Sequence, residues 1–452
     1  MWAQNVEITK SLPCTVNRLS KIFQPVNILP KNVQVKTALT SRSQRLMLNL
    51  GIIRQASPGA FYFLPLGVRA LNKLTSLVDK QMDKIGAQKV IFPSLTRSNL
   101  WNSTGRLQDF GSELFVLKDR HDHSYVLGPT HEEAAADLIA SVSQLTHKDF
   151  PIKLYQITDK YRDEIKPRFG LIRGKQFIMK DLYTFDTSVE KAKDTYEEIC
   201  QCYDNIFSEI GVQYIKAIGS CGTMGGFLSH EYHYKAEIGE DKILHCTHCG
   251  SFTNSVLFEH NKCVNCDNSQ NFTSYTGIEV GHTFLLGAKY SQVLNANYLS
   301  DQGKVIPLQM GSYGLGITRI LAAAIELLSK ENEIRWPQAF APYLIMIIPP
   351  KKGSKEEKHS KHLPDRLYNM LETVNALKGN IIIDDRTQYT IGRRVIDALK
   401  VGYPFTIVIG AKSMEAIPLY ELSDISTNET IYLNEEQLLA YVKGGLKINM
   451  LN

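Results

Sequence analysis

The sequence predicts a mixed α/β (α+β) protein, in which an antiparallel sheet flanked by helices precedes a smaller α/β domain. Two strand-like runs, 154–161 and 175–183, are separated by a loop, a pattern typical of a long antiparallel hairpin. Apolar residues recur at helical spacing in 189–210 and 317–328. Beyond about residue 338 strand and helix patterns alternate, as they do in α/β domains.

The N-terminal part of the chain is basic and poor in acids. Between Ile8 and Val78 there is no Asp or Glu, whereas ten Lys and Arg residues fall there. Residues 1–36 are also rich in Ser, Thr and Asn, a composition typical of organellar transit peptides. We therefore predict that 1–36 is a mitochondrial transit peptide or disordered leader. A disordered tail with a chance deficit of acids is the alternative.

Further elements follow in order along the chain. Apolar residues at helical spacing occur within 42–54, and residues 67–85 read as a longer helix that Gly86 ends. A short strand, 89–92, stops at a proline. Residues 131–145 are expected to form a helix with Thr130 as its N-cap.

The C-terminal part has its own pattern of strands and helices. Expected strands are 344–348, 380–383 and 405–409, expected helices are 366–377 and 391–400, and a last strand and helix fall within 418–442. We place the domain boundary near residue 338, between one domain at 37–338 and another at 339–452.

Composition sets broad limits on the class of protein. The chain has 452 residues, 43% hydrophobic and 21% charged, which is ordinary for a folded protein of two or three domains. No apolar run approaches the ~18 residues of a membrane span. A net charge of +5 permits a nucleic-acid partner without arguing for one.

Two arginine-bearing segments predict a nucleotide triphosphate site. The first, YRDEIKPRFGLIRGKQFIMKD, carries Arg162, Glu164, Arg173 and Phe177 on the hairpin, and the second, GSYGLGITR, is a glycine-rich turn that ends at Arg319. Arginines bind phosphates and an aromatic ring stacks on a base. Singly, the arginines read as surface salt bridges and the phenylalanine as core. The two common nucleotide motifs, GxxxxGK[ST] and a helix-opening GxGxxG, are absent.

Four cysteines form a metal-binding pattern. Cys246, Cys249, Cys263 and Cys266 are spaced C-x2-C-x13-C-x2-C, which suits four thiolates around a structural Zn²⁺. Free thiols left from a decayed site are the alternative.

The motifs together resemble those of a known family. The arginine segments are similar to motifs 2 and 3 of class II aminoacyl-tRNA synthetases, and KIGAQKVIFP resembles the dimer-forming motif 1. The chain resembles more narrowly the prolyl-tRNA synthetases of the bacterial and organellar type. The supporting stretches are LNLGIIRQASPGAFYFLPLG, LWNSTGR, ELFVLKDR, LGPTHEE, KPRFG, SHEY, GIEVGHTFLLGAKYS and DDR.

The resemblance implies roles for individual residues. Thr130 and Glu132 would hold the prolyl amino group, and Arg162 the α-phosphate and the proline carboxylate. His282 and Phe177 would frame the proline ring and the adenylate. ATP would be bound by Arg162, Glu164, Arg173, Phe177 and Arg319. Purely structural roles are the alternatives for two of these residues. His282 would then be a core histidine, and Glu132 a carboxylate in the first turn of a helix.

The resemblance also implies cofactors, partners and location. ATP with Mg²⁺, proline and tRNA(Pro) are the expected ligands, a homodimer the expected assembly, and the mitochondrial matrix the expected compartment. The four-cysteine segment, 240–275, is too short for the editing insertion found in many bacterial relatives, so no editing domain is expected.

The C-terminal domain resembles an anticodon-binding domain. Arg386 follows a strand end, where an arginine is well placed to read a guanine edge. A salt bridge at the strand end is the alternative for this residue.

Two other functions fit the same motifs less well. A catalytically inactive paralogue would show damaged motif arginines or a damaged TxE segment at 130–132, and both features are intact. A class II enzyme for serine or threonine would need a dedicated partner for the substrate hydroxyl, and a threonine enzyme also needs a catalytic zinc.

Overall fold

The structure is a computed structural model that describes residues 16–26, 41–142, 145–258, 262–269 and 271–444. The chain forms two compact units. The larger unit contains residues 24–340, and the smaller unit contains the segment that ends at Phe23 together with the chain from Ala341 onward. Across the described ranges no helix has both the length and the apolar character that crossing a membrane requires.

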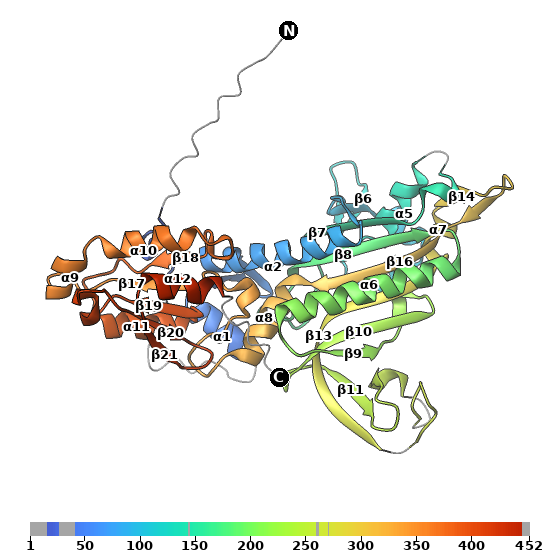
Figure 1. The fold of residues 1–452 in the computed structure, drawn as a ribbon. Helices are drawn as coiled ribbons and strands as arrows, with labels where there is room; N and C mark the ends of the chain where they lie inside the picture. The colour runs from blue at the N-terminus through green and yellow to red at the C-terminus, as the bar shows by residue number, and fades with distance from the viewer. Residues whose placement is uncertain (1–15, 27–40, 143–144, 259–261, 270, 445–452) are drawn as a thin grey trace, which may run out of the picture. The chain divides into compact units, whose positions relative to one another are not determined.

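A nine-stranded, mainly antiparallel sheet organises the larger unit (Figure 1). Its spatial order is β10-β9-β12-β11-β13-β16-β8-β7-β3, with parallel pairing only at β12–β9 and β3–β7 within the described chain. The strands are β3 (Gln88–Lys89), β7 (Ile152–Tyr161), β8 (Gln176–Asp186), β9 (Ile215–Ile218), β10 (Leu228–Lys235), β11 (Asp241–Cys246), β12 (Phe252–Asn254), β13 (Phe272–Gly287) and β16 (Gln309–Gly316). Because β13 is 16 residues long, it pairs with β11 along its first half and with β10 along its second.

Helices with an apolar face cover one side of this sheet. Helix α6 (Val189–Ile210) packs on β8, β13 and β16, and α8 (Ile317–Leu328) packs on β8 and β13, as Figure 1 lets the reader follow. Ser188 caps α6 at its start, and Gly211, at φ +77°, ends it in the left-handed conformation that favours glycine. Both helices have the predicted bounds.

Smaller elements complete the larger unit. The remaining helices are α1 (Arg42–Asn49), α2 (Pro65–Lys84), α3 (Ser98–Ser103), α4 (Arg106–Asp109), α5 (Glu132–Ala140) and α7 (Lys289–Val293). The remaining strands are β1 (Ile53–Ser57) and β2 (Ala60–Phe63), which form a hairpin, β4 (Leu95–Arg97), β5 (Val116–Lys118) and β6 (Ser124–Leu127), which form a three-stranded sheet, and β14 (Asn297–Leu299) with β15 (Val305–Pro307).

Three local predictions in this unit are wrong. Thr130 does not cap α5: its hydroxyl donates to Glu132 rather than accepting a backbone N–H, and His131 occupies the cap position. The expected glycine turn at 311–316 is strand β16, which runs directly into α8. The helical spacing in 42–54 reflects a short helix that ends at Asn49, after which the chain turns into β1.

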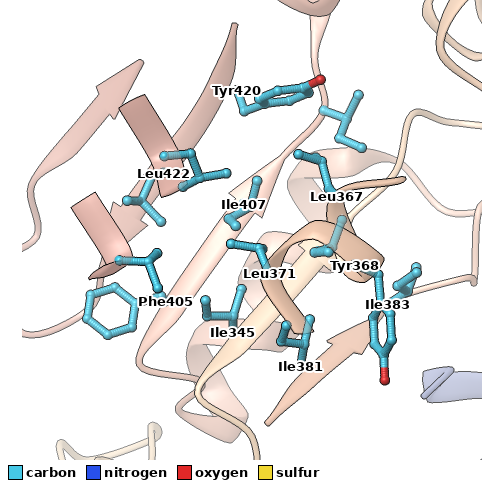
Figure 2. Close-up of a cluster of buried hydrophobic side chains, with 14 of the residues drawn as sticks. Ile345, Leu367, Tyr368, Leu371, Ile381, Ile383, Phe405, Ile407, Tyr420 and Leu422 are labelled. Carbon is cyan, nitrogen blue, oxygen red and sulfur yellow. The ribbon is translucent and has the colours of Figure 1, made fainter. Parts of the chain in front are cut away.

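The smaller unit is a five-stranded sheet with helices packed on it. Its spatial order is β18-β17-β19-β20-β21, and the first three strands run parallel. Figure 2 shows the core, in which Ile345, Ile381 and Ile407 of the sheet meet Leu367 and Leu371 of α10. The elements are β17 (Ile345–Ile348), α9 (Lys355–Ser360), α10 (Leu363–Glu372), β18 (Ile381–Ile383), α11 (Ile391–Val401), β19 (Phe405–Val408), β20 (Tyr420–Asp424), β21 (Thr430–Leu433) and α12 (Glu435–Lys443). The sequence pattern missed one strand here, because 418–433 forms two strands and not one.

An N-terminal segment, residues 16–22, completes the edge of this sheet. The backbone oxygen of Asn17 accepts from the N–H of Ile383 at 2.9 Å, and Arg18 forms a parallel bridge with the same strand residue. Ser20 donates to both carboxylate oxygens of Asp385, through its N–H at 2.9 Å and its hydroxyl at 2.6 Å. The expectation of a disordered leader is therefore wrong for 16–22, whereas residues 1–15 and 27–36 of that range lie outside the described residues.

Candidate active site

A cavity lies on the face of the nine-stranded sheet opposite α6. It has a volume of about 480 Å³, and its floor is built from β8, β13 and β16. Alternation along β8 turns Met179 and Asp181 into the cavity, whereas Lys180 between them donates to the hydroxyl of Tyr203 on α6 at 2.6 Å. On β16, Gly314 leaves the floor open, because an added Cβ would meet only the sulfur of Met179, at 3.6 Å.

A second cavity of about 260 Å³ adjoins the first. Glu113, Arg162, Glu279 and Arg319 line both cavities, so the two are compartments of one site. The first compartment also contains Thr130, Glu132, Phe177, His282 and Ser312, and the second contains Glu164, Arg173, Glu240 and Asp241.

A buried carboxylate stands at one end of the first compartment. Glu132, at the start of α5, is 0% exposed. Its Oε1 accepts from the hydroxyls of Thr130 and Ser312, each at 2.8 Å, and its Oε2 accepts from Nη1 of Arg106 at 3.0 Å. A buried carboxylate held this way at the wall of a small cavity is suited to one ammonium group.

A cation with an unused donor lies nearby. Arg162 lies one residue beyond β7, with its guanidinium carbon 5.2 Å from the centre of the Phe177 ring. Its Nε is buried and donates to no group in the described chain. Burial lowers the pKa of the Arg162 guanidinium, and the neighbouring charge of Arg319 lowers it further. Two clustered cations with free donor capacity favour an anionic ligand such as a phosphate or carboxylate.

Arg319 and His282 are tied to the same acid. Arg319 donates from Nη1 to the backbone oxygen of Glu279 at 2.9 Å, and His282 donates from Nδ1 to the Glu279 carboxylate at 2.7 Å. Burial alone would raise the pKa of the Glu279 carboxyl, but the hydrogen bond from His282 and the charges of His282 and Arg319 outweigh it and lower the pKa to about 2. The Nε2 of His282 lies 2.7 Å from the Ser229 hydroxyl. The His282 ring stacks on the Phe284 ring, with 3.8 Å between the ring centres. Its place in the cavity wall contradicts the reading as a core histidine.

The second compartment contains paired acids and arginines. Arg173 donates from Nε to Glu164 at 2.8 Å and from Nη1 to Glu240, while Arg168 donates to Glu240 at 2.7 Å. Both arginines come from the loop between β7 and β8. Glu164, like Arg162, lies beyond the end of β7.

The structure therefore brings together the active-site residues named from the sequence. Thr130, Glu132, Arg162, Glu164, Arg173, Phe177, His282 and Arg319 all line the two compartments. Three contributors were missed, namely Ser312, Glu279 and Arg106. Ser312 stood inside the glycine-rich segment and Glu279 in GIEVGHTF, so a search for polar residues within those motifs would have found both. Arg106 ends the stretch LWNSTGR, but nothing in that stretch shows that its partners would be Glu132 and Glu133.

Arg386 lies in the smaller unit, directly after β18. It donates to both carboxylate oxygens of Asp384, at 2.9 Å and 2.8 Å, and its Nη1 lies 3.4 Å from Asp397. The side chain keeps an exposed fraction of 27%. The salt bridge named as the alternative is thus present, and it leaves part of the guanidinium accessible.

The four cysteines converge at the β11–β12 hairpin. All four sulfur atoms lie within 4.8 Å of one another, with Cys249 and Cys263 at 3.7 Å and Cys246 and Cys266 at 3.8 Å. A tetrahedron with Zn–S bonds of about 2.3 Å has S···S edges of roughly 3.8 Å. The donor set and its spacing fit a zinc ion.

Comparison with known families agrees with this site. Residues 115–327 match the family described as "tRNA synthetase class II core domain (G, H, P, S and T)", and residues 345–444 match "Anticodon binding domain". The fold and site define a class II aminoacyl-tRNA synthetase.

Curated relatives and solved structures narrow the class. The "Probable proline--tRNA ligase, mitochondrial" of Rattus norvegicus is 44% identical over 431 residues, which cover 94% of this chain and 90% of the relative. That of Homo sapiens is 46% identical over 426 residues, covering 93% and 90%. The chain therefore belongs to the proline–tRNA ligase family. The prolyl-tRNA synthetase of Giardia lamblia in complex with prolyl-adenylate shares the fold, with a TM-score of 0.73 at 17% identity, covering 89% of this chain and 77% of that one.

Proposed function

We propose that the first compartment binds proline and the α-phosphate of ATP, and the second the rest of the nucleotide. The observation that carries this proposal is the pairing, in one cavity, of the buried Glu132 carboxylate with the Arg162 guanidinium. The first suits a ring ammonium and the second suits a carboxylate and a phosphate. ATP–pyrophosphate exchange measured across the twenty amino acids tests it: proline alone should support exchange, and exchange with serine or threonine instead would contradict it.

The residues support adenylate formation by positioning and by charge. An oxygen of the proline carboxylate attacks the α-phosphorus in line, a new C–O–P link forms, and the bond to the pyrophosphate oxygen breaks. Arg162 neutralises charge at the α-phosphate and Arg319 at the departing phosphates. The terminal ribose hydroxyl of tRNA(Pro) then takes the prolyl group and AMP leaves. His282 and Phe177 frame the ring and the adenylate, while Glu164 and Arg173 hold the remainder of ATP.

Mg²⁺ is proposed to enter with ATP. Glu113 and Glu279 line the second compartment, and carboxylate oxygens are the protein ligands that this ion prefers. When bound, the ion screens the phosphate charges.

A structural zinc ion is proposed for the four-cysteine cluster. Replacing Cys246 by serine is expected to abolish zinc binding and to lower Tm by more than about 4 °C, because metal binding contributes directly to folding. Elemental analysis should give one zinc per wild-type chain. Cys221→Ser is the matched control, since this half-buried thiol lies outside the cluster. A stable, zinc-free wild-type preparation would contradict the proposal.

Arg386 is proposed to contact the anticodon. Replacement by alanine is expected to reduce the rate of tRNA(Pro) charging about tenfold, since loss of a bidentate base contact costs about 1–3 kcal/mol. Proline-dependent exchange needs no tRNA and should stay unchanged. Comparing the two assays gives the answer, and equal losses in both would show that Arg386 only supports the fold through Asp384.

The acid-poor N-terminus and the mitochondrial relatives support import into the mitochondrial matrix. The contacts of Asn17 and Ser20 with the smaller unit support a processing site that precedes Val16. Mass spectrometry of the protein isolated from mitochondria should find a mature N-terminus at or before that residue. A mature chain that begins after Ile22 would contradict this position.

Two further proposals rest on the family motifs. A homodimer is proposed because the end of α2 and the following strand carry the motif 1 resemblance. The chain between β10 and β13 contains β11, β12 and the cysteine cluster, and we propose that the enzyme does not hydrolyse mischarged alanyl-tRNA.

A further inference from the structure

A fully buried arginine lies directly behind the first compartment. Arg106 begins α4 and is 0% exposed, yet it does not line the cavity. Burying a guanidinium costs several kcal/mol unless good partners replace its water. The groups that contact Arg106 therefore indicate its role.

Those partners are two adjacent carboxylates. Nη1 of Arg106 lies 3.0 Å from Oε2 of Glu132 and 3.0 Å from both oxygens of Glu133. Thr104 donates to Glu133 at 2.9 Å, which holds the second acid in place. Two neighbouring carboxylates buried this deeply repel each other, and a cation between them is what permits both to remain in one position.

An aromatic and sulfur cage holds the guanidinium itself. Its carbon lies 4.9 Å from the centre of the Trp101 ring, 5.0 Å from Phe110 and 5.4 Å from Tyr290. Nη2 approaches the Met224 sulfur at 3.1 Å. The cage leaves the guanidinium little freedom to move, so the Glu132 oxygen bound to it is also held in one place.

Both oxygens of Glu132 are thus held in place. The Thr130 hydroxyl lies 2.8 Å from each oxygen, Ser312 donates to Oε1 and Arg106 donates to Oε2. Phe110 and Met224 belong both to the cage and to the cavity wall. The arginine is therefore connected to the substrate space through the carboxylate and through its own cage.

We propose that Arg106 is a positioning residue that aims the Glu132 carboxylate at the ring ammonium of proline. This inference rests on the proposed function of Glu132. In this role Arg106 helps the enzyme to distinguish a charged substrate ring from an uncharged one, in addition to stabilising the fold.

Replacement of Arg106 by methionine tests the inference. The expected result is a rise in the KM for proline of about 10²-fold, with the KM for ATP changed less than about threefold, because an ion pair that is no longer aligned loses most of its energy. Arg106→Lys keeps the charge but not the planar fork, so it should recover only part of the loss.

An uncharged substrate analogue distinguishes loss of the Glu132 alignment from a general loosening of the pocket. Tetrahydrofuran-2-carboxylate has the size of proline but an oxygen in place of the ammonium. The inhibition constant of this analogue is measured in the exchange assay, and the dissociation constant of proline is measured by direct binding. The first divided by the second is the discrimination ratio. The ratio should fall at least about tenfold in Arg106→Met, whereas a merely loosened pocket would weaken both molecules equally.

Two more variants serve as controls. Arg394 lies in the smaller unit and is fully buried, like Arg106. In the described chain the Nε of each of these two arginines has no hydrogen-bond partner. Arg394→Met therefore reproduces the cost of removing a buried guanidinium. It should leave the discrimination ratio unchanged. The double variant Arg106→Met, Glu133→Gln removes the repulsion between the acids and keeps the experiment informative where the single variant fails to fold.

The outcomes distinguish the two claims. A wild-type enzyme that binds the analogue as well as proline refutes the proposed role of Glu132 itself. A wild-type enzyme that discriminates, together with an Arg106→Met or double variant that folds and discriminates equally well, refutes the positioning role of Arg106 alone.

Discussion

Replacing Arg162 by alanine is expected to reduce proline-dependent ATP–pyrophosphate exchange by about 10²–10³-fold, the usual cost of losing one preorganised donor at a developing charge. The side chain lies over Phe177 with an unused buried donor, and it lines both compartments of the site. No other described cation joins the two compartments except Arg319, which donates to the backbone oxygens of Ile172 and Glu279. No neighbouring side chain can therefore replace the Arg162 guanidinium at the phosphate.

The measurement needs a control for general effects on charge and stability. Arg393→Ala removes an exposed arginine whose partner, Asp397, lies one helical turn away in α11. Such a pair contributes less than about 1 kcal/mol, so exchange should stay within about twofold of wild type. Exchange at the wild-type rate in an Arg162→Ala enzyme with an unchanged Tm would exclude the proposed phosphate contact.

Replacing Glu132 by glutamine is expected to raise the KM for proline by about 10²-fold or more, because removing one partner of a buried charge pair costs about 2–5 kcal/mol. The amide also presents hydrogens where Thr130, Ser312 and Arg106 all donate. The KM for ATP should change little, since no contact of Glu132 reaches the second compartment.

The neighbouring acid provides the matched control. Glu133 is as deeply buried on the same helix but does not line the cavity, and its described partners are Arg106 and Thr104. Burial raises the pKa of the Glu133 carboxyl in spite of the opposing charge of Arg106. Glu133→Gln leaves the donors Thr130 and Ser312 on Glu132, so its effect on the proline KM should be smaller than that of Glu132→Gln. Equal increases in the proline KM for Glu132→Gln and Glu133→Gln would remove the special role given to Glu132.

Local sequence patterns predicted the parts of the fold that depend on local interactions. Helices α6 and α8 and the β7–β8 hairpin follow from apolar spacing and from the polar loop between two strands. The hairpin β1–β2 and the sheet of β4, β5 and β6 were missed, because strands of three to five residues carry too few alternating positions to be recognised.

The site was predictable where one motif contained the chemistry, and not where segments meet. Arg162 and Arg319 stood out by their motifs. Thr130 was misread as a helix cap, since nothing local shows that its hydroxyl donates to Glu132. Arg106 depends on a partner 26 residues away, and the 16–22 segment on partners 347 or more residues away. Such contacts have no periodicity to detect.

The N-terminal segment also has a consequence for the order in which the protein forms. Asn17 and Ser20 are made first, but their partners Tyr368 and Asp385 follow 351 and 365 residues later. At about 5–20 residues per second, the segment waits for roughly 20–70 s of synthesis before the strand it covers exists. In a chain that lacks residues 16–22, β18 is an open sheet edge of the kind that recruits other chains. The contacts of residues 16–22 thus cover an edge of the smaller unit, and a processing step that removed this segment would leave the mature protein more prone to aggregation.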